Sequence, residues 1–426
     1  MTKEKVIPQI RFSGFTDTWE QRKLSDTLNF LSNNTLSRAE LSEDTGTYKN
    51  VHYGDVLVKF GEYIDAQSTD LPYIADDEKA KKFESSKLQD GDIIIADTAE
   101  DEAVGKCVEI GNIGDLSIVS GLHTIPCRSK VKFAPAYLGF YLNSSSYHDQ
   151  LIPLMQGIKV TSISKSAISD TLISAPTDLS EQGKIGQFFS QLDTLITLHQ
   201  RKYDKLTKVK KAMLEKMFPE NGSPYPEIRF KGFTDAWEQR KLGEISESFE
   251  YGLNAAATEY DGKHKYIRIT DIDDSTHLFL QDDLTSPDID FSTADDYLLQ
   301  EGDVLFARTG ASVGKTYIYR RSDGDLYFAG FLIRAKIKSD YDADFVFQNT
   351  LTDSYDSYIR ITSQRSGQPG VNAQEYANFA LSVPSLAEQK KIGAYFSHLD
   401  SLITLHQRKL EKLKNIKKAC LEKMFV

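Results

Sequence analysis

The sequence holds 426 residues, of which 40% are hydrophobic and 27% charged, a composition typical of globular proteins and long enough for two or three domains. No stretch approaches the roughly 18 apolar residues of a membrane helix, and the N-terminus lacks the apolar region of a signal peptide. Three widely spaced cysteines exclude a disulfide framework and a zinc-ligand pattern. We therefore expect a cytoplasmic protein without bound metal and without a membrane partner.

The net charge of −11 is unevenly distributed along the chain. Residues 179–219 hold eight Lys/Arg against four Asp/Glu, and residues 386–426 hold nine against four, so the rest of the chain carries −20. A single lysine in these segments is explained by a solvated helix face. Two basic segments in an acidic chain nevertheless leave room for a nucleic-acid partner, which the total charge alone argues against.

The N-terminal segment, 1–24, contains a sequence that the chain repeats. Residues 8–24 (PQIRFSGFTDTWEQRKL) recur at 226–242 (PEIRFKGFTDAWEQRKL), and the two copies hold both tryptophans, Trp19 and Trp237. The D-x-x-E pattern in each copy has the form of a capping box, which predicts a short helix over WEQRKL. The tryptophans are either local core residues or part of a repeated docking surface for a partner protein.

Residues 25–177 lie between repeated segments and share only scattered patterns with the corresponding region of the second half, so we call them the first variable region. This region has a mixed α/β pattern, including a strand over Asp92–Ala96. Polar side chains follow this strand and recur in the stretch MQGIKVTSIS (155–164). Such side chains suit base edges and phosphates, although loops carry them in any protein. The candidate DNA contacts of this region are Asp97, Thr98, Lys106, Lys159, Thr161 and Ser162.

Residues 178–218 are expected to form a long helix, opened by a D-x-x-E capping box. Apolar residues recur at steps of three and four, and after Gly186 neither Pro nor Gly interrupts the segment, which predicts a helix about 50 Å long. Its stripe consists of Ile185, Phe189, Leu192, Ile196, His199, Tyr203 and Leu206.

Residues 219–242 contain a turn-rich linker and the second repeat copy, and residues 243–384 form a second α/β region. Where the first region has Asp97, the second has Arg308. Arginine suits guanine O6 and N7 whereas a carboxylate accepts from cytosine N4, so this exchange indicates different base preferences or else ordinary surface divergence. The candidate DNA contacts here are Arg308, Thr309, Ser312, Lys315, Gln364, Arg365, Gln368 and Asn372.

Residues 385–426 repeat the long helix, with the stripe Ile392, Phe396, Leu399, Ile403, His406, Leu410 and Leu413. A single helix cannot bury its own apolar stripe, and the equivalent stripe of the other long helix could cover it. We therefore predict that the two helices pair as an antiparallel coiled coil with pseudo-twofold symmetry. His199 and His406 fall on the stripes. They are either a pH switch or metal pair, or polar residues that set the register.

Motifs for catalysis are missing from the sequence. The stretch TGASVGKT (309–316) is one residue short of phosphate-loop spacing, and no dinucleotide, metalloprotease, serine-hydrolase or paired Cys-x-x-Cys motif is present. No Pro-Pro pair occurs, so the loop typical of amino-methylating DNA enzymes is missing as well. We predict no catalytic residues and no cofactor in this chain.

The helix start PSLAEQKKI (384–392), its looser counterpart APTDLSEQ (175–182) and the strand-loop GDVLFARTGASVGK (302–315) resemble the specificity subunits of type I restriction-modification enzymes. The resemblance covers essentially the whole chain, and its order of two variable regions, each followed by a long helix, matches that family.

The resemblance implies two target-recognition domains separated by paired spacer helices, each domain reading one half of a split, asymmetric site in double-stranded DNA. It also implies that the repeats dock two methyltransferase subunits, which bind S-adenosylmethionine, and that restriction and translocase subunits requiring ATP and Mg²⁺ join later. The chain itself is then a non-enzymatic subunit.

Two other functions are compatible with parts of the sequence. A self-contained DNA methyltransferase or nuclease would act on DNA as the purified chain, without partners. A coiled-coil scaffold would join two modules and show no sequence-selective protection of DNA.

Overall fold

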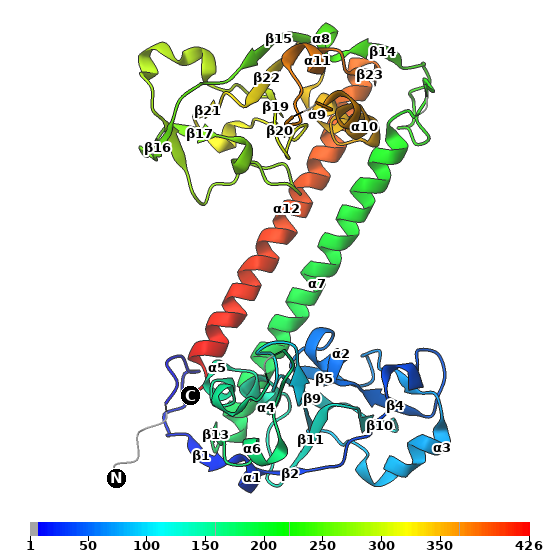
Figure 1. Cartoon of the computed structure of the whole chain (residues 1–426), viewed down its shortest axis with the longest axis vertical. Helices are drawn as coiled ribbons and strands as arrows, with labels where there is room; N and C mark the ends of the chain where they lie inside the picture. The colour runs from blue at the N-terminus through cyan, green and yellow to red at the C-terminus, as the bar shows by residue number, and fades with distance from the viewer. Residues whose placement is uncertain (1–6, 158, 221, 366) are drawn as a thin grey trace. The chain divides into compact units, whose positions relative to one another are not determined.

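The computed structural model describes residues 7–157, 159–220, 222–365 and 367–426. The chain forms two compact units, a first unit of residues 1–199 with 409–426 and a second unit of residues 200–408. Each unit contains one variable region together with portions of two long helices, α7 (Leu179–Met217) and α12 (Leu386–Lys423), which are drawn uninterrupted in Figure 1. The predicted mixed α/β class with two long helices is confirmed.

The first unit is built on a five-stranded sheet of order β2-β11-β7-β9-β5 and a four-stranded sheet of order β10-β4-β6-β3. Its strands are β1 (Glu20–Lys23), β2 (Leu28–Phe30), β3 (Leu41–Ser42), β4 (Tyr48–Val51), β5 (Tyr63–Asp65), β6 (Tyr73–Ile74), β7 (Ile93–Ala96), β8 (Thr98–Ala99), β9 (Cys107–Gly111), β10 (Ser117–Ser120), β11 (Thr124–Ser129), β12 (Thr161–Ser162) and β13 (Leu172–Ala175). Its shorter helices are α1 (Leu24–Thr27), α2 (Tyr53–Val58), α3 (Asp77–Ala80), α4 (Tyr137–Leu142), α5 (Ser145–His148) and α6 (Lys165–Ile168).

The second unit is built on a four-stranded sheet of order β15-β22-β19-β20 with three two-stranded ladders beside it. Its strands are β14 (Glu238–Lys241), β15 (Ser246–Tyr251), β16 (Ala257–Glu259), β17 (Lys265–Ile267), β18 (Thr285–Pro287), β19 (Val304–Ala307), β20 (Thr316–Ile318), β21 (Leu326–Phe328), β22 (Leu332–Ile337) and β23 (Ala380–Val383). Its shorter helices are α8 (Leu242–Ile245), α9 (Ala343–Asn349), α10 (Asp353–Thr362) and α11 (Ala373–Ala377).

The prediction of a helix over WEQRKL is wrong in both copies. Glu20–Lys23 forms strand β1 and pairs antiparallel with β13, and Glu238–Lys241 forms β14 and pairs in the same way with β23. All four residues of each strand are exposed, so no apolar face favours a helix there, and pairing with a distant strand supplies the backbone with hydrogen-bond partners. Trp19 and Trp237, which precede these strands, are both buried in the cores of their units.

In each unit the start of one long helix packs against the end of the other. The core of the first unit joins Ile185, Phe189 and Leu192 of α7 to the C-terminal end of α12, including Met424 and Phe425. The core of the second unit joins α12 to the end of α7 through Ile392, Phe396, Leu399, Met217 and Phe218. The two helices therefore run antiparallel within each unit, as the repeat predicts.

The remaining stripe residues differ in exposure. Ile403 and Leu410 are buried, whereas the following stripe residues are half-buried: Ile196, His199, Tyr203, Leu206, His406 and Leu413. A continuous coiled coil across the two units, and the role of the two histidines in it, stay predictions.

Two equivalent glycines allow the long helices to lie close to their domains. A Cβ atom at Gly186 would lie 2.5 Å from the backbone oxygen of Pro135, and one at Gly393 would lie 2.3 Å from a carboxylate oxygen of Asp342. Both contacts are far too short, so α7 and α12 each need glycine where they cross the segment before α4 and α9.

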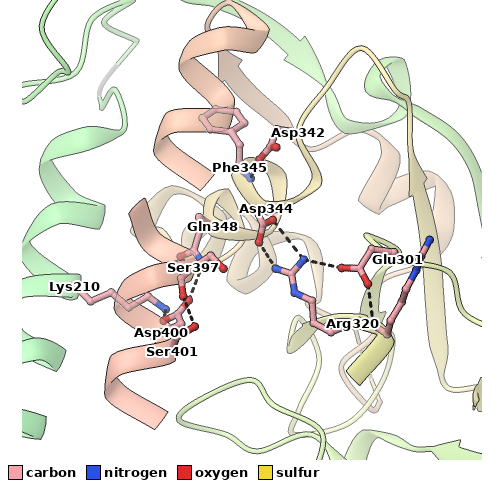
Figure 2. A network of polar contacts seen from close by, with 11 residues as sticks. Lys210, Glu301, Arg320, Asp342, Asp344, Phe345, Gln348, Ser397, Asp400 and Ser401 are labelled. Carbon is pink, nitrogen blue, oxygen red and sulfur yellow. Dashed lines mark hydrogen bonds and ion pairs between the residues drawn. The ribbon is translucent and has the colours of Figure 1, made fainter. Parts of the chain in front are cut away.

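Equivalent lysines connect the ends of the long helices to their surroundings. In the second unit, Lys210 Nζ lies 2.6 Å from Asp400 Oδ1, and Gln348 Nε2 donates to Asp400 Oδ2 at 2.9 Å. Figure 2 shows this contact beside the pair between Arg320 and Asp344 of the same unit. In the first unit, Lys417 Nζ contacts Asp193 at 2.7 Å.

Lys417 also contacts Glu62 at 2.5 Å in the first unit. Burial and the neighbouring charge of Glu62 raise the pKa of Asp193. Lys417 is thus turned inward, whereas its neighbour Ile416 is exposed.

Candidate nucleic-acid interface

The polar candidates of the first variable region gather at the end of β7. The backbone N–H of Asp97 donates to His123 O at 3.1 Å, and the N–H of Ile163 donates to Asp97 O at 2.8 Å. Strand β12, which contains Thr161 and Ser162, pairs with β8, which begins at Thr98. Four predicted residues from two distant stretches are therefore brought to one place.

His123 belongs to this cluster although the sequence analysis did not single it out. Its Nδ1 lies 3.3 Å from Asp97 Oδ1 and 3.4 Å from Thr98 Oγ1, and Thr98 Oγ1 donates to the same carboxylate at 2.8 Å. The ring of Tyr53 packs edge-on against the imidazole, with ring centroids 5.2 Å apart. The cluster thus presents a carboxylate, a hydroxyl and an imidazole.

The second variable region has the same backbone arrangement at the end of β19. The N–H of Arg308 donates to Phe331 O at 3.0 Å, and the N–H of Val371 donates to Arg308 O at 2.9 Å. These bonds match those of Asp97 with His123 and Ile163, so the predicted equivalence of Asp97 and Arg308 is confirmed.

The Arg308 side chain is held in a defined position. Its guanidinium carbon lies 5.0 Å from the ring centroid of Tyr251, and Nη1 donates to Gly330 O at 3.4 Å. Stacking on an aromatic face orients the planar guanidinium and leaves its remaining N–H groups available to a planar acceptor.

The loop after α10 lies against the loop that follows β19. Thr309 forms an isolated bridge with Gly370, and the N–H of Gly310 donates to Pro369 O at 3.0 Å. The side-chain amide of Gln368, an exposed residue, lies beside Gly310. Arg308, Thr309 and Gln368 are therefore neighbours.

The two lysines of the shared Val-Gly-Lys turns point elsewhere. Lys106 Nζ donates to the backbone oxygens of Leu57 and Phe60 at 2.8 and 3.3 Å, and burial lowers its pKa. Lys315 Nζ donates to Ile272 O at 3.0 Å and forms an ion pair with Asp274. Both ammonium groups donate to backbone carbonyl oxygens and so hold a neighbouring loop, and their contact with DNA stays a prediction.

Two candidates of the 364–373 loop also have structural partners. Asn372 caps α11 by accepting from the Glu375 N–H at 3.0 Å. Arg365 donates to Thr362 O at 2.7 Å and pairs with Glu375 at 2.5 Å. These residues shape the loop that carries Gln368.

The three remaining candidates lie on loops of the two variable regions. Lys159 and Gln364 are exposed, and Ser312 is half-buried.

Among the described residues, no group of three His, Cys, Asp or Glu side chains could hold a metal ion. Within the same ranges, no helix is both long and apolar enough to cross a membrane.

The comparison with protein families matches both halves of the chain. Residues 16–208 and 234–415 each match the family described as the type I restriction modification DNA specificity domain. These two ranges cover most of the chain and leave residues 209–233, which include the first part of the second repeat copy, between them.

Two curated relatives come from Methanocaldococcus jannaschii. The specificity subunit of the type I restriction enzyme MjaX is 26% identical over 197 residues, which are 44% of this chain and 45% of that protein. The specificity subunit of the type I restriction enzyme MjaVIII is 21% identical over 271 residues, which are 62% of this chain and 63% of that protein. The matches thus span about half to three-fifths of each relative.

A solved structure shares the fold over its full length. It is the S subunit of a type I restriction-modification system from M. genitalium, with a TM-score of 0.63, 14% identity and coverage of 99% of both chains.

Proposed function

The chain belongs to the family of type I restriction modification DNA specificity domains, and from this membership we propose that it is the DNA-specificity subunit of a type I restriction-modification complex. Each variable region reads one half of a bipartite, asymmetric site in double-stranded DNA. The subunit performs no chemistry itself, and it directs methyltransferase subunits to an adenine of that site.

One observation carries this proposal. The two regions share the backbone bonds that place Asp97 and Arg308 at the end of equivalent strands, yet the two side chains have opposite hydrogen-bonding character. Arg308 presents donors that fit guanine O6 and N7, whereas Asp97 accepts, as contact with cytosine N4 requires. A common scaffold with opposite polar groups suits two domains that read different bases.

The partners follow from the same proposal. Two methyltransferase subunits dock on the repeated segments, bind S-adenosylmethionine and contribute positive surface around the DNA. Restriction and translocase subunits bring the ATP and Mg²⁺ chemistry. The long helices set the distance between the two half-sites, because a rigid helix keeps a constant rise per residue.

Methylome sequencing tests the proposal in cells that express the chain together with its methyltransferase subunits. We expect one split adenine-methylated motif to disappear when the chain is deleted. Exchanging residues 25–177 for those of a relative should change one half of the motif and leave the other half unchanged.

Point variants sharpen this experiment. Arg308→Ala should relax one position of the half-site read by the second domain, because a bidentate contact discriminates between bases by about 1–3 kcal/mol. Asp97→Ala should relax the other half, and Arg321→Ala, which removes another arginine of the second domain, should leave the motif intact. The proposal would be contradicted if every methylated motif remained after deletion of the chain, or if one point variant changed both halves of the motif.

A further inference from the structure

An exposed ring occupies the same backbone position in both variable regions. His123 directly precedes β11 and Phe331 directly precedes β22, and each carbonyl accepts the backbone N–H of the polar residue opposite, Asp97 or Arg308. The His123 side chain is 47% exposed, and Phe331 is 61% exposed. The strands that follow are buried, so the rings stand at the edge of the core rather than inside it.

The strand after Phe331 does not need the phenyl ring as an anchor, and His123 adopts an unusual backbone conformation. Leu332 and Ile333, which follow Phe331, are fully buried, so the strand is anchored without the phenyl group. In the first region His123 has a φ of 55°, a left-handed conformation that is uncommon for residues other than glycine. Such conformations concentrate at binding sites, where the surrounding structure holds them in place.

Phe331 lies beside the group proposed to read guanine. The Arg308 guanidinium donates to the carbonyl of Gly330, the residue before Phe331, and stacks on Tyr251. An arginine that contacts guanine O6 and N7 lies in the major groove, and the 5-methyl group of thymine is the apolar feature of that groove. A phenyl ring next to such an arginine is placed to contact that methyl group.

We infer that Phe331 is a specificity-determining residue that packs against the 5-methyl group of a thymine in the half-site read by the second domain. This inference rests on the proposed function. His123 takes the equivalent place in the first domain, where its imidazole and Asp97 make a polar contact, so that half-site has no corresponding requirement for a methyl group.

Replacement of thymine by 2′-deoxyuridine removes only the methyl group and provides the test. The full-length chain is assembled with its methyltransferase subunits, and binding is measured on duplexes that carry the methylated motif. Each thymine, on either strand, is replaced one at a time. At one position in the second half-site we expect the wild-type complex to bind about fourfold more weakly, the effect of one buried methyl group.

The Phe331→Ala complex should bind the thymine duplex about fourfold more weakly than wild type and should show no further loss with deoxyuridine. Leu280→Ala is the matched control, because Leu280 is another exposed apolar side chain of this domain, at 43% exposure. It should keep the wild-type response, and replacements in the first half-site should affect all complexes alike.

Three outcomes would overturn the inference. In the first, deoxyuridine weakens binding of the wild-type and Phe331→Ala complexes equally at every thymine. In the second, Phe331→Ala binds the thymine duplex more weakly, and deoxyuridine weakens its binding by the full fourfold again. In the third, the effect of deoxyuridine is confined to the first half-site. Failure of the proposed function would instead appear as absence of sequence-selective binding by the wild-type complex, and the inference would fall with it.

Discussion

One arginine in each copy of the 8–24 repeat forms a buried ion pair with a glutamate near the start of a long helix. Arg11 Nε and Nη2 donate to the two carboxylate oxygens of Glu181 at 2.5 and 2.8 Å, and Arg229 forms the same pair with Glu388 at 2.7 Å. The two glutamate side chains are each 1% exposed. The E of each predicted capping box therefore anchors a distant segment through a charge-assisted, bidentate contact.

Loss of this pair should destabilise the first unit strongly. Arg11→Met leaves a buried carboxylate without its cation, and we expect the free energy of unfolding to fall by about 3 kcal/mol. Urea unfolding in a Trp237→Phe background measures this, because Trp19 is then the remaining tryptophan and lies in the core of the first unit.

Arg22→Met is the matched control for Arg11→Met. Arg22 pairs with Glu20 on the surface, where both side chains are about half exposed, and such a pair contributes less than about 1 kcal/mol. Equal losses of stability for the two variants would show that the buried pair contributes no more to the free energy of unfolding than the exposed pair.

At the scale of elements, each unit is completed by the end of the long helix that begins in the other unit. Phe425, just beyond α12, stacks on Phe189 with ring centroids 5.6 Å apart and contacts Trp19 at 6.4 Å. Its repeat equivalent Phe218, just beyond α7, contacts Trp237 at 6.2 Å and Phe396 at 5.9 Å. Both phenylalanines are buried, so the helix ends belong to the domain cores.

Truncating these rings should therefore weaken one unit at a time. Phe425→Ala is expected to lower the stability of the first unit by about 3–5 kcal/mol, the usual loss for a buried phenylalanine. Hydrogen exchange should then accelerate in α4 and stay unchanged in α9, and Phe218→Ala should give the reverse. Similar acceleration in both helices for both variants would contradict this assignment.

At the scale of the whole molecule, charge limits what the chain does alone. The segments outside the long helices carry −20, so the isolated chain has little attraction for the phosphate backbone. We propose that the methyltransferase subunits supply most of the positive surface.

Binding of target DNA should therefore depend on assembly. By fluorescence anisotropy, we expect the chain alone to bind with a Kd on the order of 10⁻⁴–10⁻⁶ M, as for non-specific contacts. The assembled complex should reach about 10⁻⁸ M or tighter and weaken steeply as salt rises. A tight, salt-insensitive complex of the isolated chain would refute this explanation.

The sequence by itself determined the repeat, the α/β class and both long helices. Helix α7 begins within one residue of the predicted start and ends within one residue of the predicted end, because spacing of apolar residues, capping residues and the lack of Pro or Gly act locally. The predicted strand at 92–96 also agrees with β7 for the same reason, and β19 lies in the corresponding stretch GDVLFA of the second region. Asp97 and Arg308 could be aligned because both follow these strands directly.

Only the tertiary structure decided what the side chains around these elements contact. Glu20–Lys23 became a strand because β13, about 150 residues later, offers a hydrogen-bonding edge. Lys106 turned inward because carbonyl groups about 50 residues earlier surround its ammonium group. His123 and Phe331 joined the candidate site through a backbone bond to another strand. Such contacts join segments far apart in sequence, and local periodicity carries no information about which distant groups will meet.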